Sequence, residues 1–376
     1  MLLYLHPHFT HPGGGSRFVL ETAERLAKKG MEPTVLTQSA NRKIIKDYNN
    51  IKFSFLGGSL PSTISYWLKN FSLSKKIEQK IDKLNPDIIF PQVFPANHWG
   101  FIYKKNNKKV KCIWMCQEPS AFIHDKTVID GLNFPMRWLA KISNPLFKRI
   151  DINLVKYADE IITNSRFTSG NVKRIYKRSS IPISGLGVDI KKFKPTKNKE
   201  NFIFIASRLT KFKKVDVAIK AMKYLKDYKE LNLYIGAGGE EEENLRKLAK
   251  DLKVEDKVKF LGWISQKELA YYYSRAVVVL FMSVNEPCGL VPLEAMASGT
   301  PTIATNTGGP KETIINGKTG FLVKPKNPLA VSNKIKILLE NKKMLRRMSR
   351  DARKHVEKNF TWDAVVDRLY NVFRNY

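Results

Sequence analysis

The chain has 376 residues, of which 43% are hydrophobic, and this length most naturally makes two domains. No apolar run approaches the roughly 18 to 20 residues that cross a bilayer, and the apolar start Met1–His6 leads into a glycine loop rather than a cleavage site. We therefore expect a cytoplasmic protein. The three cysteines, Cys112, Cys116 and Cys288, contain no CxxC pair, which argues against a disulfide framework or a zinc site and predicts free thiols.

The formal net charge of +32 is spread evenly along the chain. Residues 1–188 hold 29 Lys and Arg against 13 Asp and Glu, and residues 189–376 hold 37 against 21, which leaves +16 in each half. Without a concentrated basic arm, we expect no nucleic-acid partner. The run Lys104–Lys111 and the mixed segment Leu60–Lys83, which contains Trp67, could form a face for anionic lipid headgroups on the inner side of a membrane. The alternative is a lysine-rich composition without any such partner.

Strand-like and helix-like runs alternate along nearly the whole chain, which predicts parallel sheets covered by helices. In the first half we expect strands at Leu2–Leu5, Thr34–Thr37, Ile51–Phe55, Asp87–Phe90, Val110–Met115 and Glu160–Thr163. In the second half we expect them at Phe202–Ala206, Leu231–Ile235, Val258–Leu261, Val277–Phe281, Thr302–Thr305 and Phe321–Val323. Each half has the size of a Rossmann-like domain.

The segment Ser184–Pro195 contains glycines and a proline, and it places the domain boundary near residue 188. After Pro325 three helices are predicted, at Ala330–Leu339, Lys343–Lys358 and Thr361–Phe373, the last with Thr361 as its N-cap. We expect residues 1–188 with 360–376 to form one domain and residues 189–359 to form the other.

Two glycine turns follow predicted strands. Gly13, Gly14 and Gly15 open an amphipathic helix after the first strand, which is a phosphate-binding layout, although the GxGxxG fingerprint is absent. The turn Gly236–Gly239 is followed by the four glutamates Glu240–Glu243, which would repel a phosphate and instead indicate the start of a helix.

A basic turn follows the strand Phe202–Ala206. It packs four cations, Arg208, Lys211, Lys213 and Lys214, into seven residues at the carboxyl end of that strand. Arginine offers a planar two-pronged donor for phosphate and lysine a mobile point charge, so together they could neutralise a diphosphate. The alternative is a solvated turn in a lysine-rich protein.

The most informative stretch contains two glutamates, Glu286 and Glu294, on either side of a glycine. The local prolines and glycines predict a loop that leads into a helix at about Leu290–Ser298. The first amides of that helix, around Gly289, would attract phosphate, while the carboxylates would accept hydrogen bonds from sugar hydroxyls. We therefore predict a site for a phosphorylated sugar, with a surface helix carrying two solvated glutamates as the alternative.

Seven segments together resemble the retaining glycosyltransferases of family GT4. They read GGGSRFVLETAERLAKKG, NSRFTSGNVKRIY, GLGVDIKKFKP, SRLTKFKKVDVAIKA, FLGWISQKELAYYYSRA, NEPCGLVPLEAMASGTPTIATNTGG and NGKTGFLV. The resemblance runs nearly end to end. It implies the α/β GT-B fold, in which two Rossmann-like domains with parallel sheets face each other across a cleft and the C-terminal helix crosses back to the N-terminal domain. It also implies a nucleotide-sugar donor on the C-terminal domain, an acceptor on the N-terminal domain and no required metal.

The resemblance also assigns roles by position. It makes Arg208 and Lys213 the cationic pair on the departing diphosphate, and it makes Glu286 the carboxylate that faces the donor sugar. Glu294 would hold the ribose hydroxyls. The remaining donor-side positions are the phosphate-facing Gly289 and Leu290 with Cys288 beside them, the base-side Trp263 and Ile264, and the glycine loop Gly13 and Gly14.

Two positions depart from the family pattern. The residue after the catalytic lysine is usually glycine, and here it is Lys214. The loop after the strand Val110–Met115 often carries a histidine near the reacting sugar, and Gln117 stands there instead. Glutamine can donate a hydrogen bond but cannot shuttle a proton. His124, farther along the loop, could take the histidine's place on the acceptor side.

The resemblance implies transfer of a hexose, with retention, from a nucleotide-diphosphate sugar to a glycan or lipid-linked acceptor in polysaccharide biosynthesis. On the resemblance alone, mannose from a GDP-linked donor is our expectation, with UDP-linked donors as the alternative. Two other functions stay open at this point: a nucleotide-sugar or sugar-phosphate processing enzyme, and a basic protein without catalytic activity that binds polyanions or membranes.

Overall fold

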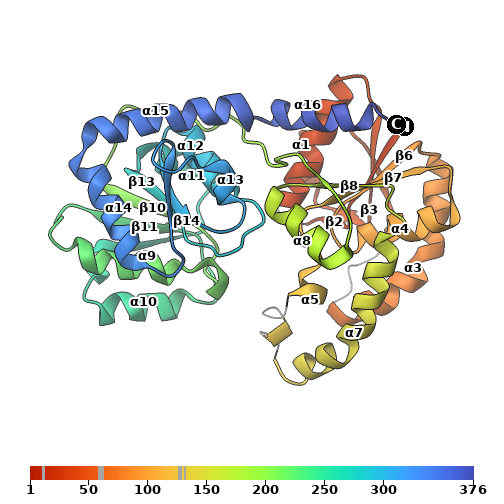
Figure 1. Cartoon of the computed structure of the whole chain (residues 1–376), viewed down its shortest axis with the longest axis horizontal. Coiled ribbons are helices and arrows are strands. Elements are labelled where there is room, and N and C mark those ends of the chain that lie inside the picture. Colours follow the sequence, from red (N-terminus) through yellow and green to blue (C-terminus); the bar gives the residue numbers. More distant parts are fainter. Residues whose placement is uncertain (11–12, 58–62, 126–128, 131–132) are drawn as a thin grey trace. The chain divides into compact units, whose positions relative to one another are not determined.

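The computed structural model of the chain describes residues 1–10, 13–57, 63–125, 129–130 and 133–376, without the side chains of residues 63–72. The chain divides into two compact units (Figure 1). Unit 1 comprises Met1–Gly185 and Val365–Tyr376, and unit 2 comprises Leu186–Ala364. The membrane face that the sequence predicts includes Trp67, whose side chain lies outside this description.

Unit 1 contains a parallel sheet of seven strands, which are the six predicted ones and a short seventh at Ile181–Pro182 that the sequence did not predict. Its strands stand in the order β5 (Lys52–Phe55), β3 (Pro33–Thr37), β1 (Leu2–Leu5), β6 (Ile88–Pro91), β7 (Lys111–Cys116), β8 (Glu160–Thr163) and β9 (Ile181–Pro182). Every residue of β1, β3 and β6 is buried, which is typical of a parallel sheet covered on both faces. A small separate pair joins β2 (His8–Phe9) and β4 (Ser39–Ala40), and the sequence reasoning did not anticipate it.

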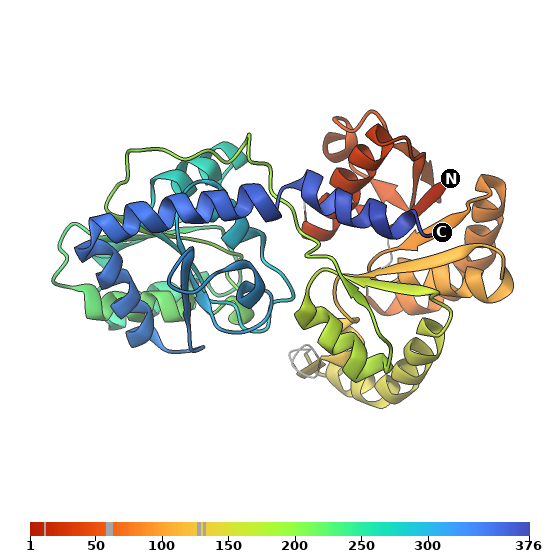
Figure 2. The same ribbon diagram turned by 45° about the horizontal axis from the view of Figure 1, so that its top comes forward.

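Helices cover both faces of this sheet. They are α1 (Gly14–Lys28), α2 (Arg42–Ile45), α3 (Thr63–Leu84), α4 (Ala96–Asn106), α5 (Ala121–His124), α7 (Met136–Val155) and α8 (Arg166–Tyr176). On one face Trp114 of β7 packs edge-on against Phe101 of α4 and Tyr176 of α8. On the other face Phe90 of β6 meets Phe373 of the last helix, α16 (Trp362–Phe373), with ring centroids 5.0 Å apart. The two chain ends lie side by side (Figure 2).

Unit 2 contains a six-stranded parallel sheet. Its order is β12 (Val258–Gly262), β11 (Asn232–Gly236), β10 (Phe202–Ala206), β13 (Val278–Phe281), β14 (Thr302–Thr305) and β15 (Gly320–Val323). All six predicted strands are confirmed. The chain runs outward from β10 through β11 to β12 and then returns to β13, so β10 and β13 are neighbours at the point where the strand order reverses. In open parallel sheets ligands bind beyond the carboxyl ends of the strands at this reversal.

The helices of unit 2 also lie on both faces (Figure 1). One apolar core holds residues of α9 (Val215–Met222), α10 (Glu242–Asp251) and α14 (Pro328–Glu340), and the other holds residues of α11 (Gln266–Arg275), α12 (Leu290–Ala297) and α15 (Lys342–Asn359). The short elements are α13 (Pro310–Thr313) and the 3₁₀ turns η1 (Lys211–Lys213), η2 (Lys223–Leu225) and η3 (Glu255–Lys257).

The predicted C-terminal helices are confirmed to within two residues at each end. Thr361 accepts a hydrogen bond from the amide of Ala364 at 3.2 Å, as expected of an N-cap. The last helix, α16, passes from unit 2 into unit 1 at Val365. Among the described residues, no helix combines the length and the apolar character that crossing a bilayer requires.

Candidate active site

The central feature of unit 2 is an ion pair between Lys213 and Glu286. Lys213 lies in the turn η1 directly after β10, and Glu286 lies in the loop between β13 and α12. The Lys213 Nζ is 2.8 Å from Oε1 and 2.6 Å from Oε2 of Glu286, and both side chains are half-buried. Because β10 and β13 are adjacent, their carboxyl ends bring the two groups together at the reversal of strand order.

The turn around Lys213 contains an unusual backbone conformation. Lys214, the residue that replaces the family's glycine, has φ 50° and ψ 39°, which lies in the left-handed region. A residue with a Cβ atom pays roughly 1 to 2 kcal/mol in this conformation, and glycine does not. The structure thus explains in physical terms why glycine suits this position, and it shows that the turn forms with lysine.

The helix α12 begins at Leu290 and ends at Ala297, close to the predicted range. Gly289 is its N-cap, has extended backbone and provides no side-chain cap. The first amides of a helix lack intrahelical acceptors, so this end can receive an anion. Glu294 lies buried in the second turn. Burial raises the pKa of the Cys288 thiol to about 12, so this side chain stays protonated at neutral pH.

A glycine turn after β14 supports the loop of Glu286, and the sequence reasoning did not assign it a role. The Gly309 amide donates to the Glu286 carbonyl at 2.8 Å, and the Asn285 amide donates to Thr307 Oγ1 at 3.1 Å. Gly308 has φ 64°, and a Cβ atom there would lie 2.3 Å from the Glu286 carbonyl oxygen. The signal in the sequence was the pair Gly308-Gly309, three and four residues beyond the end of the buried strand β14.

Arg208 is exposed, and the loop that contains it rests on the glycine turn after β11 through the buried Leu209. The Leu209 amide donates to the Gly238 carbonyl at 3.1 Å, and the Glu241 amide donates to the Leu209 carbonyl at 3.0 Å. A Cβ atom on Gly239 would lie 2.4 Å from the Leu209 carbonyl oxygen, so only glycine allows this approach. The glutamates that follow start the helix α10, as predicted.

Two predicted base-side residues also lie beside this glycine turn. Trp263 is largely exposed, and its Nε1 is 2.9 Å from the position of a Cβ atom on Gly238. The Cδ1 of Ile264 is 2.7 Å from the same position on Gly236. The loops after β10, β11 and β12 therefore contact one another at the same edge of the sheet that holds Lys213 and Glu286.

In unit 1 the glycine loop lies against Gln117. Gly13 is the N-cap of α1 and Gly14 its first residue. A Cβ atom on Gly15 would lie 3.0 Å from Oε1 of Gln117, and Asn164 Nδ2 donates to the Gln117 carbonyl at 2.8 Å. The Nε2 of Gln117 is buried and has no hydrogen-bond partner in the described part of the chain.

His124, the other predicted acceptor-side residue, lies in a buried cluster around Asp151. The carboxylate of Asp151 accepts hydrogen bonds from His98 Nε2, His124 Nε2 and the Tyr176 hydroxyl, each at 2.7 Å. Burial alone would raise the pKa of Asp151, but the hydrogen bonds from His124, His98 and Tyr176 hold it well below its usual range. His124 therefore joins α5 to α7 in this structure, instead of being an exposed loop residue.

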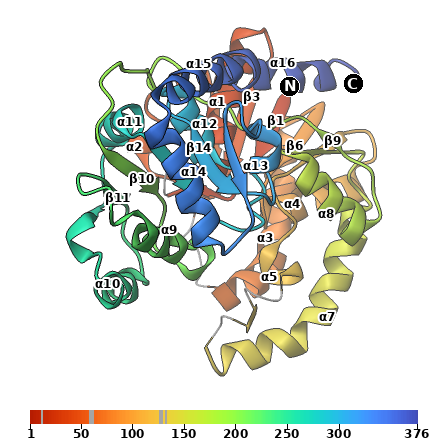
Figure 3. The same cartoon turned by 60° about the vertical axis from the view of Figure 1, so that its left-hand side comes forward.

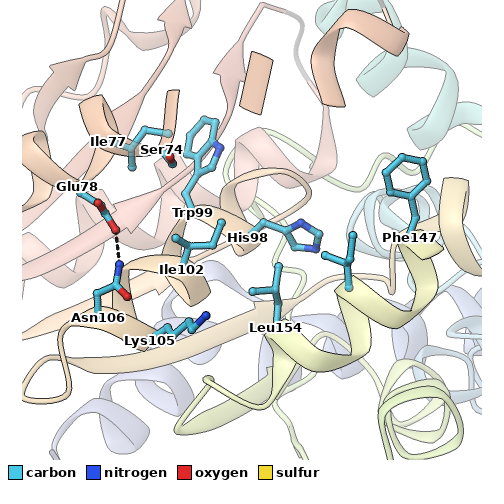
Figure 4. Close-up of a pocket in the computed structure, with 11 residues that line it drawn as sticks. Ser74, Ile77, Glu78, His98, Trp99, Ile102, Lys105, Asn106, Phe147 and Leu154 are labelled. Atoms are coloured by element: carbon cyan, nitrogen blue, oxygen red, sulfur yellow. Dashed lines mark hydrogen bonds between the residues drawn. The ribbon is translucent and has the colours of Figure 1, made fainter. Parts of the chain in front are cut away.

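Unit 1 also contains an apolar pocket of about 340 Å³ between α3, α4 and α7 (Figure 4). Ile77, Trp99, Ile102, Phe147, Ile150 and Leu154 form its apolar lining. Glu78 at its rim accepts a hydrogen bond from Asn106 at 2.7 Å, which Figure 4 shows. None of the predicted site residues lines it. The described residues hold no cluster of three or more His, Cys, Asp or Glu side chains that could bind a metal ion.

Two family models match this chain, one over most of unit 2 and one over most of unit 1. Residues 188–355 match the model described as Glycosyl transferases group 1, and residues 12–192 match the model Glycosyltransferase Family 4. Together the two matches extend from residue 12 to residue 355. The chain therefore belongs to the GT4 family of glycosyltransferases and has the GT-B fold, as the resemblance implied.

Individual relatives support this assignment. The D-inositol 3-phosphate glycosyltransferase of Streptomyces avermitilis is 30% identical over 59% of this chain and 53% of that protein, so the match spans about half of its length. The N-acetyl-alpha-D-glucosaminyl L-malate synthase of Bacillus anthracis is 25% identical over 96% of this chain and 93% of that protein. The structure of HepE from Anabaena in complex with UDP has a TM-score of 0.79 with 18% identity and 100% coverage of both chains, which establishes a common fold.

Proposed function

We propose that the protein transfers a hexose, with retention of anomeric configuration, from a nucleotide-diphosphate sugar to a glycan or lipid-linked acceptor. The observation that carries the proposal is the contact of Lys213 with Glu286 at the strand-order reversal, directly before the start of α12. This places a cation, a carboxylate and the start of a helix at one edge of the sheet. These groups complement a sugar diphosphate, because sugar hydroxyls donate hydrogen bonds to carboxylates and phosphates accept them from cations and amides.

In this proposal the diphosphate lies against Lys213, Arg208 and the amides of Gly289 and Leu290. Glu286 accepts hydrogen bonds from the sugar hydroxyls, and Glu294 accepts those of the ribose. Negative charge grows on the leaving diphosphate as the bond to the anomeric carbon breaks. Fixed positive groups at that point stabilise the transition state more than the ground state, and this difference accelerates the reaction.

The proposed reaction uses no metal ion, because two side-chain cations and the helix start supply the charge that a diphosphate requires. It also uses no strong base. The acceptor hydroxyl attacks the anomeric carbon, the bond to the diphosphate breaks, and the hydroxyl proton leaves with a phosphate oxygen. Gln117 can orient the acceptor or sugar by hydrogen bonds but cannot carry this proton. Unchanged turnover in EDTA is the expected result.

Mannose from a GDP-linked donor is the specific donor that we propose, and UDP-linked hexoses are the alternative. HepE of Anabaena was solved in complex with UDP and with UDP-glucose, which supports a nucleotide-sugar donor but not guanine or mannose in particular. The acceptor that we propose is a lipid-linked or envelope glycan, which places the protein at the inner membrane surface. Part of the predicted basic run is used internally, since Lys104 pairs with Asp159 at 2.9 Å.

A donor screen tests the proposal. Nucleoside diphosphate released from GDP- and UDP-linked hexoses is measured with and without lipid-linked and glycan acceptors. We expect one donor to be consumed faster when an acceptor is present, and the matching nucleoside diphosphate to raise the unfolding temperature. Release that no acceptor accelerates would favour a sugar-phosphate processing enzyme. Stabilisation by polyanions alone would favour a binding protein.

A further inference from the structure

The helix α7 carries a stripe of large apolar side chains on the outside of unit 1. Trp138 is 59% exposed, Leu139 48%, Ile142 60% and Leu146 60%, and Phe134 just before the helix is 76% exposed. Leu139, Ile142 and Leu146 follow Trp138 by one, four and eight residues, and this spacing places the four side chains on a single face of the helix. Isolated exposed apolar residues are ordinary, but a contiguous apolar face marks an interaction surface.

The C-terminal half of α7 is attached to unit 1, and this fixes the direction of the helix. Asp151 is fully buried under its three hydrogen bonds, and Val155 belongs to the apolar core. Phe147 and Leu154 face the pocket shared with α3 and α4 (Figure 4). Figures 1 and 3 both show the first half of α7 (yellow) extending away from the sheet of unit 1. Because the packed C-terminal half holds the helix in this orientation, the apolar stripe faces outward.

The charges of α7 identify the partner. Its ionisable residues are Arg137, Lys141, Lys148, Arg149 and Asp151, and the only acidic one among them is buried. Lys141 pairs with the exposed Asp130 at 2.8 Å, and an exposed pair of this kind contributes little and leaves the helix surface basic. An apolar stripe beside basic groups fits the boundary between anionic headgroups and acyl chains. If the α7 helices of two copies of this chain packed against each other, the four cations of one helix would face the four cations of the other. This repulsion disfavours self-association through α7.

We propose that α7 lies in the headgroup region of an anionic lipid bilayer, with Trp138, Ile142 and Leu146 inserted among the acyl chains. Trp138 suits this depth because its ring is apolar and its indole N–H can bond to headgroups. The inference deepens the membrane contact in the proposed function, and it assigns that contact to a different surface from the one that the sequence predicted. Vesicle binding and donor turnover are separate measurements, so each proposal can fail without the other.

The experiment is co-sedimentation of the full chain with vesicles of phosphatidylcholine and phosphatidylglycerol and with vesicles of phosphatidylcholine alone. We expect binding to the anionic vesicles only, and the triple variant W138S/I142S/L146S should bind them at least about tenfold more weakly. The matched control L329S/I337S replaces two exposed apolar residues of α14 and should bind like the parent. Equal melting temperatures would show that the variants fold, as expected for exposed positions.

Charge reversal gives a second arm of the test. K148E/R149E on α7 should weaken binding, whereas R346E/R347E on α15 makes the same change in charge and should leave binding nearly unchanged. In addition, brominated lipids should quench the tryptophan fluorescence of the parent. They should not quench that of Trp138→Phe, which keeps an apolar side chain at this position but lacks the indole. The proposal would be overturned if the triple variant bound the anionic vesicles as tightly as the parent, or if the parent bound neutral and anionic vesicles equally. It would also be overturned if the parent bound no vesicles and formed a dimer that the triple variant lost.

Discussion

Lys213 and Glu286 are 73 residues apart in the sequence, and the Nζ of the first lies 2.6 Å from Oε2 of the second. Neither residue belongs to a regular strand or α-helix. The two residues come together because of the order of the strands. β11 and β12 lie on one side of β10, and the chain then returns to place β13 on the other side, directly beside β10. The reversal of strand order thus assembles a charged pair from two loops.

Replacing Lys214 with glycine should stabilise the protein, because the positive φ no longer strains a side chain. We expect the free energy of unfolding to rise by about 0.5 to 1 kcal/mol, which is the strain relieved less the larger entropy of glycine in the unfolded chain. Urea unfolding measures it. The control Lys211→Gly changes the same turn outside the left-handed region and should lower stability, so a similar loss in both variants would refute this explanation.

Gly308→Ala should lower turnover by at least about tenfold, because the new Cβ would lie 2.3 Å from the Glu286 carbonyl oxygen and displace the carboxylate. Gly317→Ala is the matched control, since Gly317 also has a positive φ but no atom within 4 Å of its Cβ position. It should cost stability of about 1 kcal/mol with unchanged turnover per folded molecule. Equal effects on turnover would mean that the turn after β14 does not position Glu286.

Asp151→Asn should destabilise the protein by about 3 kcal/mol, because it removes a buried charge that three groups contact. The exposed Asp130→Asn, which removes the partner of Lys141, should change stability by less than about 0.5 kcal/mol. Thermal or urea unfolding of both variants at pH 7 gives the comparison. A small effect at Asp151 would show that the cluster does not hold α7 in place.

The pH dependence of the stability difference between the parent and Asp151→Asn follows from the lowered pKa of Asp151. An unfolded aspartate has a pKa of about 3.9, and the folded value lies below it. The contribution of Asp151 to stability is therefore complete above about pH 4 and is lost as the pH falls toward the folded pKa. The difference in stability between the parent and Asp151→Asn should shrink below that pH, and a difference that grows on acidification would contradict the lowered pKa.

Much of the fold could be predicted because buried parallel strands are short apolar runs between turns. Phe202–Ala206 and Thr302–Thr305 were predicted to the residue, and α12 to within one residue. The long helix α7 was missed. Its interior proline, Pro145, resembles a helix end, which divides the apolar pattern of the segment into two short pieces.

The candidate site was predictable only where residue types carry the chemistry. The acidic pair Glu286 and Glu294 and the basic turn stand out in the sequence because carboxylates, cations and a helix start occur beside buried strands. The pair Gly308-Gly309 indicates a turn, but its contact with the Glu286 loop and the partnership of His124 with Asp151 join distant segments, and no local pattern shows such contacts. Backbone strain at Lys214 likewise became visible only with the dihedral angles.

The most direct test of the proposed chemistry compares turnover in Lys213→Ala and Lys211→Ala. Both residues belong to the turn η1, but Lys213 contacts Glu286 at 2.6 Å, whereas the exposed Lys211 is 4.0 Å from Glu241. Release of nucleoside diphosphate from the active donor should fall by about 10² to 10³ in Lys213→Ala, with the fold intact, and stay near the parent rate in Lys211→Ala. Near-normal release by Lys213→Ala would contradict the role of this lysine at the departing diphosphate.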